Sequence, residues 1–222
     1  MGGDTMIAAT RFRRQSAVLM FATEFSGASL TEQGVEEFAP AFIISKIGGK
    51  LNRALICGVI DRMERREGDS GSSYSGSIRD PTGVYFFNVA PFQTELHADA
   101  EELVSRFESG ERFLLMMVGK SRWYENDDGA IFTSLRAEEF TIVDKERYMC
   151  WLVGASDSTL RRIVSYEKSL DCVPNIPAMK SSGTPEDLIP GIVAARQHYP
   201  NVDTEELRLG VLQALSMVIG KK

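Results

Sequence analysis

Apolar residues in the middle of the chain alternate with polar or small ones at a spacing of two, which is the pattern of half-buried β-strands. In Leu51–Met63, for example, Leu55 and Val59 alternate with Ile56 and Ile60. The small residue Gly58 suits a sharply coiled strand with a bend. The same spacing predicts strands at Tyr74–Arg79, Val84–Val89, Phe113–Trp123 and from Ala130–Leu135 onward, and shorter β-like runs at Ala41–Ile47 and Phe140–Val143.

The turn Asp80-Pro81-Thr82-Gly83 separates the second and third of these strands. Pro81 fixes a φ suited to a turn and Gly83 tolerates a positive φ, so the pair of strands reads as a hairpin. Apolar residues at helical spacing predict a helix over Asp99–Ser109, capped by Asp99 and ended by Gly110. The order strand, strand, strand, helix, strand, strand is the layout of the OB-fold. We therefore expect a mainly β protein whose centre is a five-stranded OB-fold barrel.

Helical patterns lie on both sides of the predicted barrel. We expect helices over Arg11–Phe25 and Asp144–Leu170, a third starting at Thr184-Pro185, and the strongest tail helix over Asp203–Gly220. Charged and small residues at Arg62–Gly71 predict a loop. The expected organisation is an N-terminal helical segment (1–45), a barrel (46–145), a post-barrel helix (146–170), a linker (171–183) and a C-terminal helical tail (184–222), with residues 1–10 as a disordered or tag-like leader.

Composition narrows the function mainly by exclusion. The three cysteines, Cys57, Cys150 and Cys172, have no zinc spacing, and their odd number argues against a disulfide framework. We expect them to be reduced in a cytoplasmic protein. Only two histidines occur, His97 and His198, so a zinc or triad enzyme is not expected, and we expect no cofactor and no catalytic residue. No apolar run approaches the ~18 residues that would suggest a membrane span, so we expect no membrane partner.

The first candidate binding face lies on strands two and three. Because Ile78 is apolar while its neighbours are polar, we expect Ile78 inside together with Tyr85 and Phe87. That assignment places four side chains on the outer face: Ser77, Arg79, Phe86 and Asn88. An exposed aromatic ring beside an arginine is what stacking on an unpaired base requires. The alternative is that Phe86 packs under the N-terminal helix or a partner subunit.

Two further sets of cations and aromatics extend this candidate face. The predicted hairpin of strands four and five contributes Lys120, Arg122, Trp123, Tyr124, Phe132 and Arg136. Neighbours on a strand point opposite ways, so either Trp123 or Tyr124 is expected to complete the core instead. The first loop contributes Arg62, Arg65 and Arg66, which either follow phosphates or form part of a solvated charged loop.

Charge does not favour nucleic acid by itself. The whole chain has a net charge of −6, and Lys46–Asp144 has 12 Lys and Arg against 17 Asp and Glu, a net charge of −5. If the barrel binds DNA alone, we expect weak binding that depends strongly on salt. Val118-Gly-Lys-Ser121 resembles the end of a phosphate-binding loop but lacks its upstream glycine spacing, so we expect no nucleotide-dependent enzyme.

The chain resembles a known family over Arg14–Leu170, the archaeal replication protein A-associated proteins, which are OB-fold partners of the archaeal single-strand-binding protein RPA. The resemblance lies in RQSAVLMFATEFSGAS (Arg14–Ser29), FAPAFIISKIGGKLNRALICGVI (Phe38–Ile60), RDPTGVYFF (Arg79–Phe87), VGKSRWYENDDGAIFTSLRAEEFTIVD (Val118–Asp144) and TLRRI (Thr159–Ile163). The tail beyond Asp171 lies outside it.

The resemblance implies a subunit that binds single-stranded DNA in replication, repair or recombination, with the RPA large subunit or another OB-fold protein as its partner. It carries over no catalytic residues. The alternative is an assembly subunit that docks a protein partner through its helices and does not contact DNA. By analogy with the helices that follow OB-folds in RPA assemblies, the docking residues would be Tyr148, Trp151, Leu152, Ala155 and Ile163.

Overall fold

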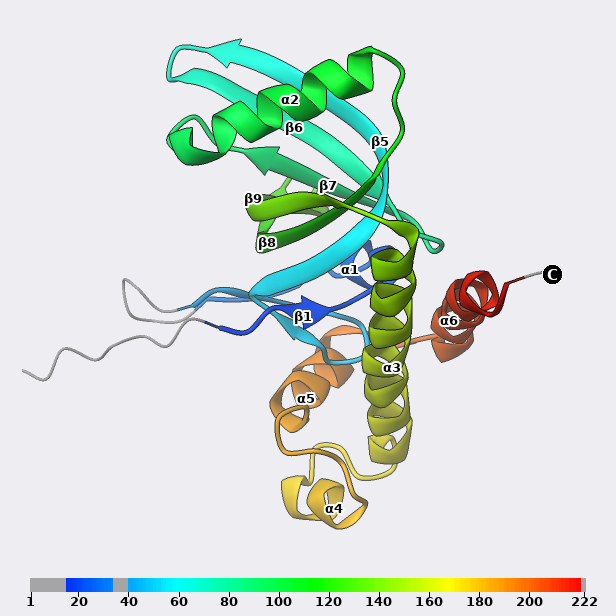
Figure 1. The fold of residues 1–222 in the computed structure, drawn as a ribbon. Coiled ribbons are helices and arrows are strands. Elements are labelled where there is room, and N and C mark those ends of the chain that lie inside the picture. The colour runs from blue at the N-terminus through cyan, green and yellow to red at the C-terminus, as the bar shows by residue number, and fades with distance from the viewer. Residues whose placement is uncertain (1–14, 34–39, 221–222) are drawn as a thin grey trace, which may run out of the picture.

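The computed structural model describes residues 15–33 and 40–220 of the chain (Figure 1). Its elements in chain order are β1 (Val18–Leu19), α1 (Ala22–Ser26), β2 (Leu30–Glu32), β3 (Phe42–Ile44), β4 (Lys50–Leu51), β5 (Arg53–Gly68), β6 (Gly71–Arg79), β7 (Val84–Val89), the 3-10 turn η1 (Thr94–Leu96), α2 (His97–Glu108), β8 (Leu114–Glu125), β9 (Ile131–Val143), α3 (Lys145–Ser169), α4 (Ile176–Ser181), α5 (Ile189–His198) and α6 (Thr204–Ile219). Helices make up a large part of this list, so the fold is mixed and the expectation of a mainly β protein is wrong.

The main sheet has six strands in the order β1-β5-β6-β7-β9-β8, and β8 also pairs with β5. The β7–β9 pairing is parallel. The pairings β5–β6, β6–β7 and β8–β9 are antiparallel. The helix α2 follows β7 and precedes β8, as the sequence order predicts, and lies against the upper part of the sheet in Figure 1. The expected strand count of five is corrected to six, because β1 joins the edge of β5 in parallel. A separate sheet contains β2, β3 and β4.

The Asp80–Gly83 turn joins β6 and β7 where it was expected. The Asp80 carboxylate accepts hydrogen bonds from the backbone N–H of Thr82 and of Gly83, which closes the turn. The backbone N–H of Ala22 donates to the same carboxylate over 2.8 Å, so the turn also holds α1. Gly83 does not adopt a positive φ, contrary to the expectation. A Cβ at Gly83 would lie 3.4 Å from the Cβ of Ala22, which is an ordinary contact, so neither its φ nor the space around it requires glycine at this position.

The core inside the sheet is the one that the alternation predicts. Ile78, Tyr85 and Phe87 are fully buried and belong to one apolar cluster with residues of β5, β8, β9 and α2. Gly58 allows a close strand approach, because a Cβ there would lie 2.2 Å from the carbonyl oxygen of Arg79. The predicted helix cap at Asp99 is wrong, since α2 begins at His97 and no side chain caps it.

The predicted loop Arg62–Gly71 is instead a long β-hairpin. Strand β5 continues to Gly68, and its pairing with β6 runs from Arg62 opposite Ser77 to Gly68 opposite Gly71. Ion pairs between side chains two residues apart, such as Arg65 with Glu67, lie along the strand. A solvated strand tolerates charged residues on both faces when they neutralise one another. The composition of the segment did not reveal that its charges pair in this way along a strand.

The N-terminal expectation is also corrected. Residues 11–14 lie outside the described residues, and the remainder of Arg11–Phe25 forms the short strand β1 and the five-residue helix α1 rather than one helix. Val18 and Leu19 pair with Ala54 and Leu55 of β5. The edge of β5 provides backbone partners for Val18 and Leu19. These residues therefore form a strand, although the spacing of the apolar residues in this segment favours a helix.

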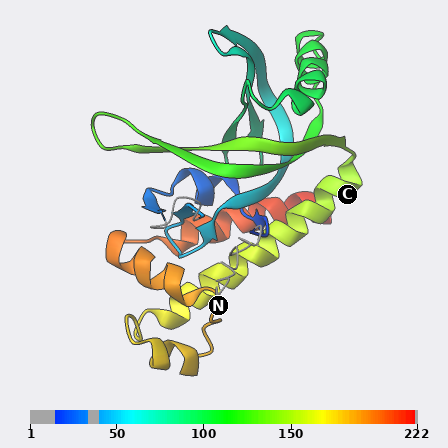
Figure 2. The same cartoon turned by 90° about the vertical axis from the view of Figure 1, so that its left-hand side faces the viewer.

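The C-terminal half of the chain folds around α3, which Asp144 caps by accepting a hydrogen bond from the Arg147 N–H. The expected linker 171–183 contains α4, and the helix expected from Thr184-Pro185 begins later, at Ile189. Figure 2 shows these helices below the sheet. The tail contacts the N-terminal part directly, because the Tyr199 hydroxyl donates to the Ile44 carbonyl and accepts from the backbone N–H of Ser29.

Candidate nucleic-acid interface

The outer face of the sheet carries a row of side chains that crosses five paired strands. Glu64 of β5 lies opposite Ser75 of β6, and Ser75 lies opposite Asn88 of β7. Asn88 pairs with Arg136 of β9, and Arg136 pairs with Lys120 of β8. The row therefore begins with a carboxylate on β5 and ends with two cations on β9 and β8.

Two residues further along the strands, a second row runs beside the first. Arg62 lies opposite Ser77, and Ser77 lies opposite Phe86. On the neighbouring hairpin, Ser134 of β9 pairs with Arg122 of β8. The two rows together place Lys120, Arg122 and Arg136 next to one another, and we call these three residues the outer-face cation cluster.

The cluster is half-buried, and within the described part of the chain none of its three side chains forms an ion pair. Burial lowers the pKa of Lys120, and the neighbouring charges of Arg122 and Arg136 lower it further. Burial and the charge of Arg136 lower the pKa of Arg122 as well. The Nε of Arg136 is buried and has no hydrogen-bond partner. These cations repel one another, and the charge of Glu138, which pairs with Arg53, offsets only part of that repulsion at Lys120 and Arg122. An anion placed between the three cations would therefore be stabilised.

Two exposed aromatic rings flank this cluster. Phe86 is 58% exposed on β7, which decides against the alternative that it packs under the chain's own helices. Phe92, in the connection from β7 to η1, is 68% exposed, and the Arg136 guanidinium lies 5.3 Å from its ring centroid. Sequence reasoning missed Phe92 because the connector has no strand periodicity. The signal that could have found it is an aromatic residue directly after Pro91, three residues beyond the predicted strand Val84–Val89.

The β8–β9 hairpin projects beyond the rest of the sheet (Figure 2). Tyr124 and Phe132 pair across its strands and are both exposed. Trp123 faces the other way and packs against the apolar core, which settles the alternative between the two aromatics. The tip of the hairpin therefore extends the aromatic surface away from the outer-face cation cluster.

The arginines of the β5–β6 hairpin differ from the cluster because their charges are already neutralised. Arg62 and Arg66 both pair with Glu64, Arg65 pairs with Glu67 and Glu101, and Arg79 pairs with Asp61. Arg62, Ser75 and Arg66 lower the pKa of the Glu64 carboxyl to about 2. The alternative of a solvated charged surface therefore describes Arg62, Arg65 and Arg66 better than phosphate tracking does.

Ser77 is another correction. Its place on the outer face is as predicted, but it is buried, because its short side chain lies between the larger Arg62 and Phe86 on the paired strands. Asn88 is half-buried beside Arg136. The side chains that the structure brings together on the accessible face are thus Phe86, Asn88, Lys120, Arg122 and Arg136, with Phe92 added.

The residues predicted to dock a partner pack within the chain itself. Tyr148, Trp151, Leu152 and Ala155 are buried in a cluster with Phe21, Cys57 and residues of α6, and Ile163 is buried against α4 and α5. The Trp151 Nε1–H donates to the Leu55 carbonyl over 2.9 Å. These side chains were assigned to a partner because the sequence did not reveal that the tail folds back onto α3.

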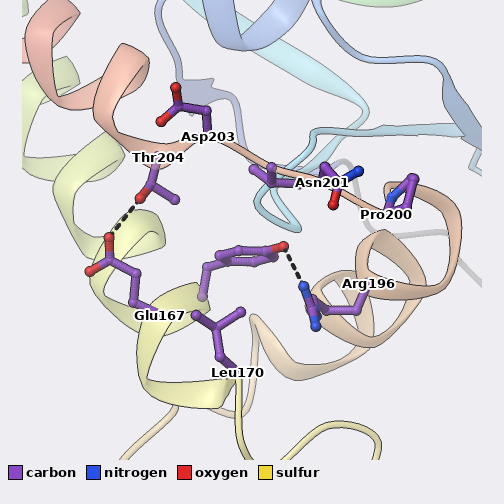
Figure 3. A pocket seen from close by; sticks show the side chains of 9 residues that line it. Glu167, Leu170, Arg196, Pro200, Asn201, Asp203 and Thr204 are labelled. Carbon is purple, nitrogen blue, oxygen red and sulfur yellow. Dashed lines mark hydrogen bonds between the residues drawn. The ribbon is translucent and has the colours of Figure 1, made fainter.

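The best-formed pocket lies away from the outer face of the sheet. A pocket of about 440 Å³ lies between α3, α5 and the start of α6, where Arg196 donates to the Tyr166 hydroxyl and Thr204 donates to Glu167 (Figure 3). Four of its polar side chains thus pair with one another. Among the described residues there is no group of three or more His, Cys, Asp or Glu side chains that could hold a metal ion, and no helix is long and apolar enough to span a bilayer.

No family model matches the chain, and no curated protein matches it. Among solved structures, it is similar to the mitochondrial single-stranded DNA binding protein Rim1 of S. cerevisiae, at 21% identity and a TM-score of 0.28 over 42% of this chain and 95% of that one. It is also similar to a Plasmodium falciparum SSB in complex with ssDNA, at 13% identity and a TM-score of 0.32 over 43% and 97% of the two chains. A third similar structure is OBody NL8 bound to hen egg-white lysozyme, at 12% identity and a TM-score of 0.32 over 42% and 94%. At these TM-scores the likeness decides neither the fold nor the function of this chain.

Proposed function

We propose that this chain binds single-stranded DNA without catalysing a reaction. We further propose that the strands that carry the site, β5, β6, β7, β9 and β8, form an OB-fold barrel. The observation that carries the proposal is the outer-face cation cluster between the exposed rings of Phe86 and Phe92. Three cations that form no ion pair with the described residues suit the phosphates of a strand, and two accessible rings suit its unpaired bases. Because every base has a π-face, such a surface holds a strand with little regard to sequence.

The strand follows a defined path in this proposal. Its bases stack on Phe86 and Phe92, and its backbone runs along Lys120, Arg122 and Arg136 toward the hairpin rings of Tyr124 and Phe132. The β5–β6 arginines contribute little, because each already pairs with a carboxylate of its own surface. The net negative charge of the chain keeps affinity modest and makes it fall as salt rises.

A fluorescence titration of labelled oligo-dT at several salt concentrations tests this function. The expected result is binding that weakens with salt, and that weakens further in Phe86→Ala and in Arg122→Ala. The plot of log affinity against log salt should flatten by about 0.7 in Arg122→Ala, the share of one phosphate contact on a single strand. Arg66→Ala is the matched control and should bind as the unchanged protein does. An affinity for oligo-dT that does not change with salt would contradict the proposal, and so would an equal loss of affinity in Arg66→Ala and Arg122→Ala.

We extend the proposal to a cellular role as an RPA-associated subunit in the cytoplasm, acting in replication, repair or recombination. Its support is the resemblance of Arg14–Leu170 to that family, in particular RDPTGVYFF and TSLRAE. Co-purification of the full chain with an archaeal RPA large subunit is the test. Separate elution of the two proteins at micromolar concentration would remove this part of the proposal and leave DNA binding untouched.

A docking role is the second candidate, and a different surface favours it. On α6, Leu209, Leu212 and Ile219 are exposed at helical spacing and point away from α3. If docking alone is the function, Leu212→Glu should abolish co-purification with the RPA large subunit, while the protein causes no shift of oligo-dT. Retention of DNA binding in Leu212→Glu would assign the two activities to separate faces.

A further inference from the structure

Strand β9 has one edge that is largely unpaired. It pairs with β8 along its whole length, whereas its pairing with β7 is limited to Leu135 and Arg136. The Gln93 side chain donates to the Ala137 carbonyl over 2.6 Å and so satisfies the next position on that edge. Among the described strands, none pairs with the edge from Glu139 to Ile142. Apart from a 3.4 Å hydrogen bond from the Thr141 hydroxyl to the Ile142 carbonyl, no hydrogen bond from the described residues reaches the backbone groups that point away from β8 there. These groups can therefore pair with another chain.

A groove of about 320 Å³ lies beside this edge, between β9 and α2. Leu103 of α2 and the half-buried Phe140 and Ile142 of β9 form its apolar part. Asp99 and Glu102 of α2 contribute exposed carboxylates. The groove therefore combines an open strand edge, an apolar floor and an acidic wall.

Among the described residues, the one cation that lines the groove is already shared between carboxylates. Arg106 donates to Glu111 over 2.8 Å and lies 3.8 Å from Glu102. The wall is left with a net negative charge, since Asp99 adds its own carboxylate to this set. A peptide strand that pairs with β9 places alternate side chains on opposite sides. Those directed to α2 would meet carboxylates if they were lysine or arginine.

We propose that this edge binds an extended, basic segment of another protein, which adds a strand to β9. Backbone hydrogen bonds to Glu139–Ile142 hold the segment. Its side chains directed to α2 are Lys or Arg, whose charged ends face Asp99 and Glu102 while their methylene stems cover Leu103 and Phe140. The groove shares no residue with the outer-face cation cluster. The inference therefore goes beyond the proposed DNA binding, and the two proposals can be tested independently.

Selection of a displayed library of random octapeptides on the full chain tests the site. The enriched peptides should carry Lys or Arg at every second position with β-branched residues between them. Adding a synthetic enriched peptide should slow hydrogen exchange at the backbone N–H groups of Glu139–Ile142. The double variant Asp99→Lys, Glu102→Lys should lose at least tenfold in affinity, and its circular dichroism spectrum should match that of the unchanged protein.

A backbone-methylated copy of the same peptide separates strand addition from simple charge attraction. It keeps every side chain but lacks the donors that pair with a strand edge, so we expect it to bind at least tenfold more weakly. Three outcomes would overturn the proposal: no enrichment of alternating basic peptides, equal binding to the double variant, or equal binding of the methylated peptide. The oligo-dT titration, run on the same double variant, should be unchanged.

Discussion

The guanidinium of Arg162 in α3 pairs with the carboxylate of Glu24 in α1 through two hydrogen bonds of 2.8 and 2.7 Å. Both side chains are almost completely buried, at 5% and 1% exposure. The Ser45 hydroxyl donates to the same carboxylate, and Arg162 also donates to the Leu19 carbonyl. One buried ion pair thus joins α3 to β1, α1 and the segment after β3.

Removal of the arginine from this pair should destabilise the whole chain. Arg162→Met leaves the Glu24 carboxylate buried without its counter-charge, and loss of one partner of a buried pair typically costs about 3–5 kcal/mol. Urea unfolding followed by tryptophan fluorescence measures the free energy of unfolding. Arg161→Met is the control next to it, because the Arg161–Asp187 pair is exposed and contributes about 0–1 kcal/mol. Equal losses in the two variants would show that burial of the pair is unimportant.

Two helical glycines should respond to alanine with opposite signs. A Cβ at Gly191 in α5 would lie 2.0 Å from the Gly48 carbonyl oxygen, so Gly191→Ala must push α5 away, at a cost of about 1–3 kcal/mol. At Gly154 in α3 the nearest atom would be Leu19 Cδ1 at 3.5 Å, an ordinary contact. Gly154→Ala should therefore stabilise the helix by roughly 0.5–1 kcal/mol. Thermal unfolding of both variants is the measurement, and destabilisation by Gly154→Ala would refute the packing that the structure gives to α3.

The Glu64 carboxyl should titrate far below its ordinary range. Hydrogen bonds from Arg62, Ser75 and Arg66 lower its pKa from 4.5 to about 2. Because the folded-state pKa is lower, the stabilisation is fully present above pH 4.5 and is lost as the pH falls through about 2. A carbon-13 NMR titration of the carboxyl measures the midpoint, and Arg62→Ala should raise it toward 4.5. A midpoint that is insensitive to Arg62→Ala would mean that these ion pairs do not persist in solution.

Removal of the Phe92 ring should weaken binding of single-stranded DNA. If one base stacks on this ring, Phe92→Ala loses about 1–3 kcal/mol of binding free energy. The loss should be equal at low and high salt, because no phosphate contact is removed. Leu209→Ala is a suitable comparison, since Leu209 is similarly exposed but lies on α6. The oligo-dT titration measures both, and an affinity of Phe92→Ala equal to that of Leu209→Ala would place the bases elsewhere.

Local patterns in the sequence were sufficient to predict the central strands and the candidate face. The alternation of apolar and polar residues predicts both ends of β7 correctly, at Val84 and Val89. It also predicts its faces, since Tyr85 and Phe87 could only be buried if Phe86 and Asn88 faced outward. The Asp80–Gly83 turn and the helix before Phe113 established the order of the elements. These features depend on neighbouring residues, and the period of a strand or helix is visible in the residues that form it.

Only the tertiary structure decided which charges and apolar faces are available. Arg66 and Arg122 look equivalent in sequence. The extension of β5 along β6 places Glu64 on the same strand face as Arg66, two residues away, while Arg122 has Arg136 as a neighbour. Trp151 has the spacing of a docking residue, yet Phe21 and residues of α6 cover it. The sequence by itself determined the periods, the turn and the order of strands. Long-range pairing determined which cation forms an ion pair and which helix face meets solvent, because such contacts join residues that are distant along the chain.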